Sequence, residues 1–129
     1  MIIGIVCDFV LNPLLEEWIK GKIDEIIQRG LKKDACFITM SLEGYYIEII
    51  QRLVGTKHYI VSPYGKYEYP SAICTFHGDI NFMVDMADYI VIISNGGNHS
   101  EWEKIRKSQI GRIEINYLTK KEKFYDRNV

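Results

Sequence analysis

The sequence is poor in the residues that mark disulfide-bonded and metal-binding proteins. Its three cysteines, Cys7, Cys36 and Cys74, are widely spaced and form no CxxC pair. This odd number and spacing argue against a disulfide framework and against a zinc knuckle. The three histidines are scattered without metal-ligand spacing. We therefore expect no metal ion and no other cofactor, and a reducing, cytoplasmic environment.

No charge of one sign dominates the chain. Its formal net charge is −1 at pH 7, and no basic block stands out. Proteins that bind a nucleic-acid backbone carry a basic surface, so this nearly neutral net charge argues against nucleic acid as the main partner. The charged fraction of 26% and hydrophobic fraction of 47% are those of an ordinary globular protein, which excludes a disordered chain.

Long apolar runs are also missing. No apolar stretch approaches the roughly 20 residues that a membrane-spanning helix needs. The opening run, residues 2–6, is short and follows no charged segment, so we expect a strand there and no signal peptide. A membrane is therefore not an expected partner.

The chain does contain short apolar runs that alternate with helical patterns. Apolar runs or alternating patterns predict five strands, at residues 2–6, 35–40, 57–61, 89–93 and 112–118. Apolar residues at helical spacing predict four helices, at residues 13–29, 46–54, 79–87 and 100–108. Asp79 is expected to cap the third of these helices.

This order predicts one Rossmann-like α/β domain over residues 1–118. Its helices should sandwich a mostly parallel five-stranded sheet in the order 3-2-1-4-5. Residues 64–73 are expected to be irregular, and residues 119–129 to form a charged, solvated tail.

Such a sheet binds ligands beyond the carboxyl ends of its strands, where the strand order reverses. Here that point lies between the first and fourth predicted strands. The polar and glycine-containing loops at this edge supply the candidate ligand-binding residues, which are Asp8, Ser41, Glu43, Gly44, Asn81, Ser94, Gly96, Gly97, Ser100 and Glu101.

One segment resembles a known family. Residues 81–88, "NFMVDMAD", precede an apolar strand, a polar glycine loop and the segment "SEWEKIR" at residues 100–106. This arrangement resembles the second half of SLOG-superfamily domains, whose pattern reads N-x-x-M-v-x-x-A-D. The superfamily includes the LOG-type nucleotide phosphoribohydrolases, and nucleoside deoxyribosyltransferase-like proteins have a related shape.

The resemblance implies a Rossmann-like fold that holds a nucleotide or its phosphate at two glycine turns. Asn81 matches the family's asparagine, and residues 41–48 occupy the place of the first turn. The catalytic block of the LOG enzymes is not reproduced, so the resemblance assigns no reaction.

Two interpretations of the loop at residues 94–100 stay open. Free backbone N–H groups at the start of the following helix can bind phosphate, with Gly96 and Gly97 allowing close approach. Alternatively, Ser100 and Glu103 form a capping box, so that the helix satisfies its own donors.

The leading functional hypothesis is the binding of a nucleotide or nucleotide-derived small molecule. One alternative is an N-glycosidase or phosphoribohydrolase, in which Glu48 or Glu101 is the catalytic carboxylate beside the sugar. Another is a non-enzymatic interaction module with a vestigial crevice, whose tyrosine-rich surface binds another protein or a second copy of the chain; the sequence has nine tyrosines.

Overall fold

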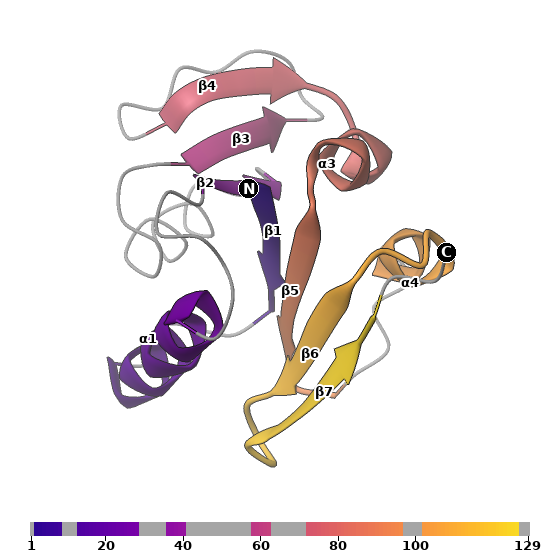
Figure 1. Cartoon of the computed structure of the whole chain (residues 1–129). Helices are drawn as coiled ribbons and strands as arrows, with labels where there is room; N and C mark the ends of the chain where they lie inside the picture. The colour runs from indigo at the N-terminus through magenta and orange to yellow at the C-terminus, as the bar shows by residue number, and fades with distance from the viewer. Residues whose placement is uncertain are drawn as a thin grey trace.

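A seven-stranded sheet forms the centre of the protein (Figure 1). This computed structural model describes residues 2–8, 13–28, 36–40, 58–62, 72–96 and 102–126. The strands are β1 (Ile2–Cys7), β2 (Cys36–Met40), β3 (His58–Ser62), β4 (Ala72–His77), β5 (Tyr89–Ser94), β6 (Arg112–Asn116) and β7 (Lys121–Tyr125). Their order is β4-β3-β2-β1-β5-β6-β7, with β7 antiparallel to β6 and all other neighbours parallel. The predicted α/β class with a mostly parallel sheet is confirmed.

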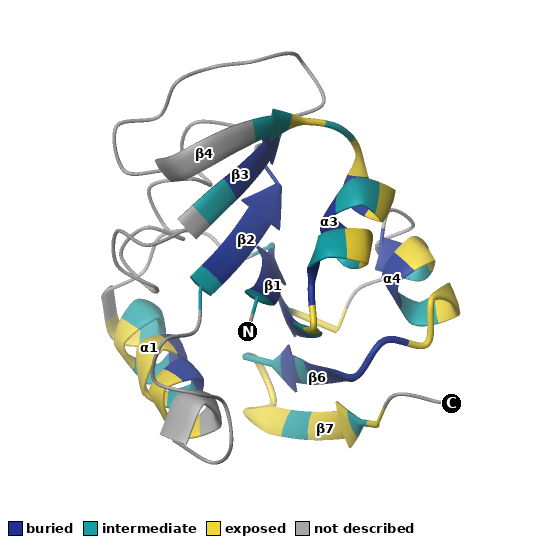
Figure 2. Ribbon diagram, turned by 45° about the horizontal axis from the view of Figure 1, so that its top comes forward, coloured by how far each residue is buried: buried dark blue, intermediate teal, exposed yellow. Residues whose placement is uncertain are grey.

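The described helices cover both faces of this sheet (Figure 2). They are α1 (Pro13–Gln28), α3 (Ile80–Met86) and α4 (Glu103–Lys107). Ile19 and Ile23 of α1 belong to one core cluster, and Met83 of α3 and Ile105 of α4 belong to the other. The sheet therefore lies between α1 on one side and α3 and α4 on the other.

The continuous apolar runs explain why β1 and β5 occupy the middle. Successive side chains of a strand point to opposite faces, so a strand covered on both faces needs apolar residues throughout. In β1, Ile3 and Ile5 face the α1 side, whereas Val6 belongs to the cluster under α3 and α4. Gly4 lies where α3 ends, and a Cβ at this position would come within 3.0 Å of Ile90 Cγ1. Glycine thus allows α3 to pack closely on the sheet.

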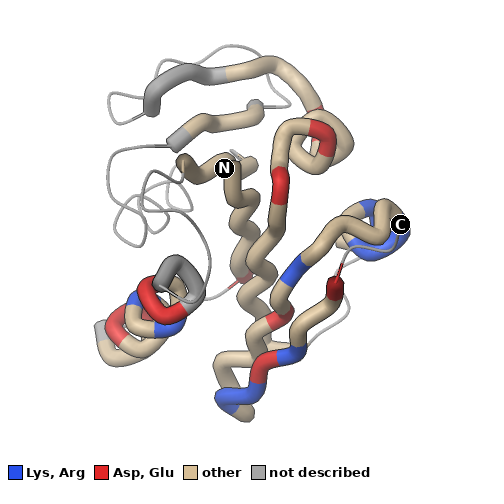
Figure 3. The backbone as a smooth tube through the Cα atoms, viewed as in Figure 1, with Lys and Arg blue, Asp and Glu red and all other residues tan. Residues whose placement is uncertain are grey.

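Among the described residues, Lys, Arg, Asp and Glu occur in the helices, the connections and the β6–β7 hairpin (Figure 3). Strands β1 to β5 contain no Lys, Arg, Asp or Glu. No helix in the described part of the chain is both long enough and apolar enough to cross a membrane.

The sheet is larger than the sequence predicted. We expected five strands in the order 3-2-1-4-5, and the structure has β4 and β7 in addition, one at each edge. The prediction for residues 64–73 missed the start of β4, which pairs with β3 through a register shift between His58 and Tyr59. The ring of Phe76 in β4 packs on Tyr59 of β3 and Phe82 of α3, at centroid distances of 5.9 and 5.3 Å. These contacts join separate segments, so a local pattern does not reveal them.

Strand β7 lies within residues that we expected to form a solvated tail. Asn116 Oδ1 accepts hydrogen bonds from the backbone N–H groups of Leu118 and Thr119, at 3.0 and 3.2 Å, and so shapes the turn before β7. Glu122 lies 3.7 Å from Lys22 Nζ of α1, which anchors the strand to one helix. The many charged residues of this segment led to the prediction of a solvated tail. Charged residues are also typical of edge strands, where they prevent pairing with other chains.

The start of α3 agrees with the prediction, whereas the start of α4 differs from it. Asp79 caps α3 as predicted, because its Oδ1 accepts from the backbone N–H groups of Asn81 at 3.0 Å and Phe82 at 3.3 Å. In contrast, α4 begins at Glu103 and not at Ser100. The residue before it, Trp102, is only 3% exposed and makes no side-chain capping bond, so burial of the indole positions this helix start.

Substituting Asp79→Ala should lower the free energy of unfolding by about 1 kcal/mol, because two N–H groups at the start of α3 lose their acceptor. The matched control is Asp85→Ala, at an exposed position of the same helix, where we expect a change below about 0.5 kcal/mol. Urea denaturation of both variants measures the difference. Equal losses would show that the Asp79 cap does not stabilise α3.

Candidate functional site

The strand order reverses between β1 and β5, and this point is the expected place for a ligand. From β1 the chain passes through α1 to β2, whereas from β5 it passes through α4 to β6 on the other side. The two connections lie on opposite faces of the sheet and diverge, and in such sheets a ligand crevice is expected beyond the carboxyl ends of the strands at this point. We call the described residues that end these strands the carboxyl-edge group, and they are Asp8, Ser94, Asn95, Gly96, Asn116 and Tyr117.

Asp8 connects the ends of three strands. Its backbone N–H donates to Ile93 O of β5 at 3.2 Å. Its carboxylate Oδ2 accepts from the backbone N–H of Asn95 at 3.4 Å. Its carboxylate also accepts a hydrogen bond from the Tyr117 phenol, which follows β6. The sequence predicted Asp8 as a ligand residue, and the structure places it at the centre of the carboxyl-edge group.

The turn after β5 is held in one conformation by its neighbours. Ser94 O accepts from the Tyr117 N–H at 3.0 Å, and Ser94 Oγ accepts from the Gly96 N–H at 3.2 Å. Gly96 has φ +86°, and a Cβ there would come within 2.6 Å of Asn116 Nδ2. A left-handed residue in close contact with a neighbour requires glycine. Ser94 and Gly96, both predicted, are thus brought together with Asp8.

Tyr117 has a perturbed phenol. Burial, the negative charge of Asp8, the hydrogen bond to Asp8 and the charge of Cys7 all raise the pKa of Tyr117 above its ordinary value. The phenol therefore stays protonated at neutral pH and donates to the Asp8 carboxylate. An aromatic donor and a carboxylate side by side can bind a polar, ring-containing molecule.

Sequence reasoning missed Asn116 and Tyr117. The predicted fifth strand runs to residue 118 and so contains both residues, whereas β6 ends at Asn116. The signal that could have found these two residues is their position directly at the carboxyl end of a strand beside the reversal point.

The structure does not join Asn81 to this group. Asn81 is exposed in the first turn of α3, which follows β4. The neighbouring "A-D" of the resemblance has a structural role, since Asp88 Oδ2 accepts from the Ile2 N–H at 2.8 Å at the opposite edge of the sheet.

The other predicted residues divide into two groups. Glu103, of the proposed capping box, accepts a hydrogen bond from Arg106 Nη1 at 2.9 Å with its Oε1. Seven candidates lie outside the described residues, and they are Ser41, Glu43, Gly44, Glu48, Gly97, Ser100 and Glu101. Within the described segments, no cluster of His, Cys, Asp or Glu side chains is arranged to hold a metal ion.

No protein-family model, curated protein or solved structure matches the chain. Its function therefore has to be inferred from its residues and their arrangement.

Substituting Gly96→Ala should lower the free energy of unfolding by at least about 1 kcal/mol, because a Cβ fits neither the positive φ nor the contact with Asn116. The matched control is Gly21→Ala in α1, where nothing lies within 4 Å of a new Cβ. There, alanine should raise stability by about 0.5–1 kcal/mol through its higher helix propensity. Thermal and urea denaturation measure both changes. Wild-type stability of Gly96→Ala would contradict the described turn.

The titration of Tyr117 should depend on Asp8. The folded chain holds the phenol proton more tightly than the unfolded chain, so this stabilisation is present below the ordinary pKa of about 10 and is lost as pH rises through the folded value. Asp8→Asn should bring the pKa of Tyr117 down and flatten this loss of stability at high pH. Carbon-13 NMR of labelled tyrosine rings measures the pKa directly.

Tyr89 is an internal control for this titration. Burial and the charge of Asp126 raise its pKa, without a contribution from Asp8. Asp8→Asn should leave the Tyr89 titration unchanged. A Tyr117 pKa that is equally high in Asp8→Asn and wild type would show that the two side chains do not interact.

Proposed function

We propose that the chain binds a nucleotide or nucleotide-derived small molecule in the crevice beyond the carboxyl ends of β1 and β5. The observation that carries this proposal is the meeting of Asp8, Ser94 and Gly96 in one hydrogen-bonded group at the point where the strand order reverses. The resemblance to SLOG-superfamily domains supports the choice of a nucleotide. In this proposal, β3-β2-β1-β5-β6 is a Rossmann-like core in the order 3-2-1-4-5, and β4 and β7 are additions at its edges.

The negative charge of Asp8 determines which part of the nucleotide can lie beside it. Asp8 carries a negative charge, which repels phosphate and accepts hydrogen bonds from hydroxyl and N–H groups. The sugar or the base of the ligand is therefore the part that contacts Asp8 and Ser94. The Tyr117 ring beside them offers an aromatic surface for the same part of the ligand.

The proposal is restricted to binding. The two carboxylates considered for an N-glycosidase, Glu48 and Glu101, lie outside the described residues. Asp8 is already engaged by the Asn95 N–H and the Tyr117 phenol, an arrangement that suits a positioning group.

A thermal-shift screen against nucleoside mono-, di- and triphosphates, linear and cyclic dinucleotides and ADP-ribose derivatives tests this function. A ligand at about 100 times its Kd should stabilise the fold by roughly 2.7 kcal/mol, which raises Tm by several degrees. Asp8→Asn should reduce the ligand-induced rise in Tm, because an amide replaces the charged acceptor. The matched control, Asp85→Asn on α3, should keep the full rise, and Asn81→Ala tests whether the site extends to α3.

Each variant is compared with its own ligand-free Tm, so that a loss of intrinsic stability is not mistaken for a loss of binding. A flat response of the wild-type chain across the whole panel would contradict the proposal. In that case, sedimentation at several protein concentrations would show whether the chain assembles with itself, as the interaction-module hypothesis requires.

A further inference from the structure

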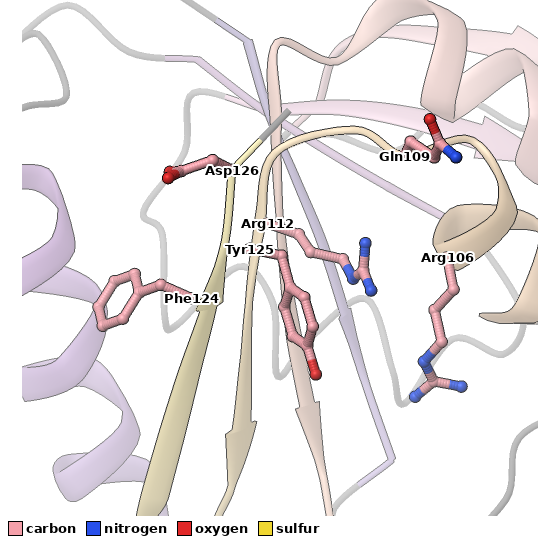
Figure 4. Close-up of a pocket in the computed structure, with 6 residues that line it drawn as sticks. All are labelled: Arg106, Gln109, Arg112, Phe124, Tyr125 and Asp126. Carbon is pink, nitrogen blue, oxygen red and sulfur yellow. The ribbon is translucent and has the colours of Figure 1, made fainter. Parts of the chain in front are cut away.

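A second hollow lies at the opposite edge of the sheet from the crevice (Figure 4). It is open to solvent, has a volume of about 500 Å³, and is lined by Arg106, Gln109, Arg112, Phe124, Tyr125 and Asp126. We call it the amino-edge hollow, because Arg112 is the first residue of β6 and pairs with Tyr125, the last residue of β7. This volume is within the range of small-molecule sites.

Two contacts hold the Arg112 guanidinium, but they do not use all of its hydrogen-bond donors. Its Nε donates to Glu114 Oε2 at 3.1 Å, and its guanidinium lies 4.1 Å from the centre of the Tyr125 ring. The side chain is only 11% exposed. Among the described residues, no hydrogen-bond acceptor engages its two terminal nitrogens. These nitrogens are not among the buried, unpaired side-chain atoms of the described residues, so they reach the solvent of the hollow and are available to a ligand there.

The neighbouring Arg106 differs, because carboxylates engage all three of its nitrogens. Its Nε and Nη2 donate to Glu114 Oε1 at 3.1 and 2.9 Å, and its Nη1 donates to Glu103 Oε1 at 2.9 Å. Glu114 is therefore shared between two arginines. The Nη1–Nη2 edge of Arg112 is the pair of donors that this network leaves open.

Gln109 also lines the hollow. It follows the C-cap of α4 and has φ +60°, the left-handed conformation common at helix ends. Its side chain lies at the rim of the hollow, on the side of Arg106 and Arg112 (Figure 4).

We propose that the amino-edge hollow binds a small molecule through a single carboxylate group. The two carboxylate oxygens accept from Nη1 and Nη2 of Arg112 in the forked geometry that guanidinium groups favour. The Gln109 amide supplies a further contact. This site is separate from the nucleotide crevice and does not depend on it.

The balance of charge favours a carboxylate over a phosphate. The two guanidiniums bond to two carboxylates, those of Glu103 and Glu114, and a third carboxylate, Asp126, also lines the hollow. A multiply charged anion would meet no net positive charge, and its second charge would be repelled. A monoanion needs only the open edge of Arg112.

NMR titration of the full chain with nitrogen-15 label in its backbone and arginine side chains tests this inference. The probes are acetate, benzoate, succinate and glutamate, with inorganic phosphate for comparison and sodium chloride to hold the ionic strength constant. Acetamide is the matched neutral probe for acetate. We expect saturable shifts of the Arg112 side-chain signal and of the Gln109 and Tyr125 amides with at least one carboxylate, and none with acetamide.

Three variants locate the site. Arg112→Lys keeps the charge but loses the forked donor pair, and should weaken binding by about tenfold. Gln109→Gly removes the rim amide, suits the positive φ and should weaken binding severalfold, so it tests the site even where Arg112→Lys fails to fold. Lys107→Gln, which removes an exposed charge of α4 outside the hollow, is the control and should bind like wild type.

The outcomes separate clearly. Carboxylate binding that weakens in Arg112→Lys or Gln109→Gly and persists in Lys107→Gln supports the site. The absence of saturable shifts with every carboxylate would overturn it, as would equal binding of acetamide. Tighter binding of phosphate would overturn the assignment to a carboxylate.

Discussion

The parallel pairing of β1 with β5, buried on both faces, is the constraint on which the rest of the structure depends. Residues 3–7 of β1 pair with residues 89–93 of β5, and apolar side chains of this pair point to both faces of the sheet. Such a pair is stable only when helices exclude water from each face. The described helices satisfy this requirement by lying on opposite sides of the sheet, with α1 on one and α3 and α4 on the other.

This burial requirement also sets where the strand order reverses. Because the chain leaves β1 and β5 for opposite faces, the two connections diverge at the carboxyl ends of these strands, which is where sheets of this kind bind ligands. The polar residues that end the strands, Asp8, Ser94 and Tyr117, bond with one another there. The apolar strands of the core therefore end in polar residues that lie close together. The position of the candidate site follows from the packing of the core.

The β6–β7 hairpin has a different physical basis. Its first strand, β6, pairs with β5 and buries Ile113 and Ile115 in the core, whereas β7 is the edge strand and pairs with β6. Lys22 of α1 contacts Glu122 of β7, and Arg112 stacks on Tyr125 within the hairpin. The proposed carboxylate site thus lies where an edge strand of low apolar content joins the sheet.

The local features of the fold could be predicted from the sequence. The apolar runs of β1, β2 and β5 predict buried strands because side chains on both faces must be apolar, and the Asp79 cap follows from a side chain and backbone groups two or three residues away. Asp8, Ser94 and Gly96 were predicted as site residues because the ends of parallel strands meet at one edge. Strand β4 could not be predicted in this way, since Phe76 depends on ring contacts with Tyr59 and Phe82 from other elements.

The sequence by itself therefore determined the α/β class, the central strands and the edge at which polar residues would gather. Only the tertiary structure decided that the sheet extends to seven strands, that Tyr117 bonds to Asp8, and that Arg112 has an open donor edge. The physical reason is the range of the interactions. Strand periodicity and helix caps depend on residues that are close together in the sequence. The hydrogen bond between Asp8 and Tyr117 forms only when the core brings distant segments together.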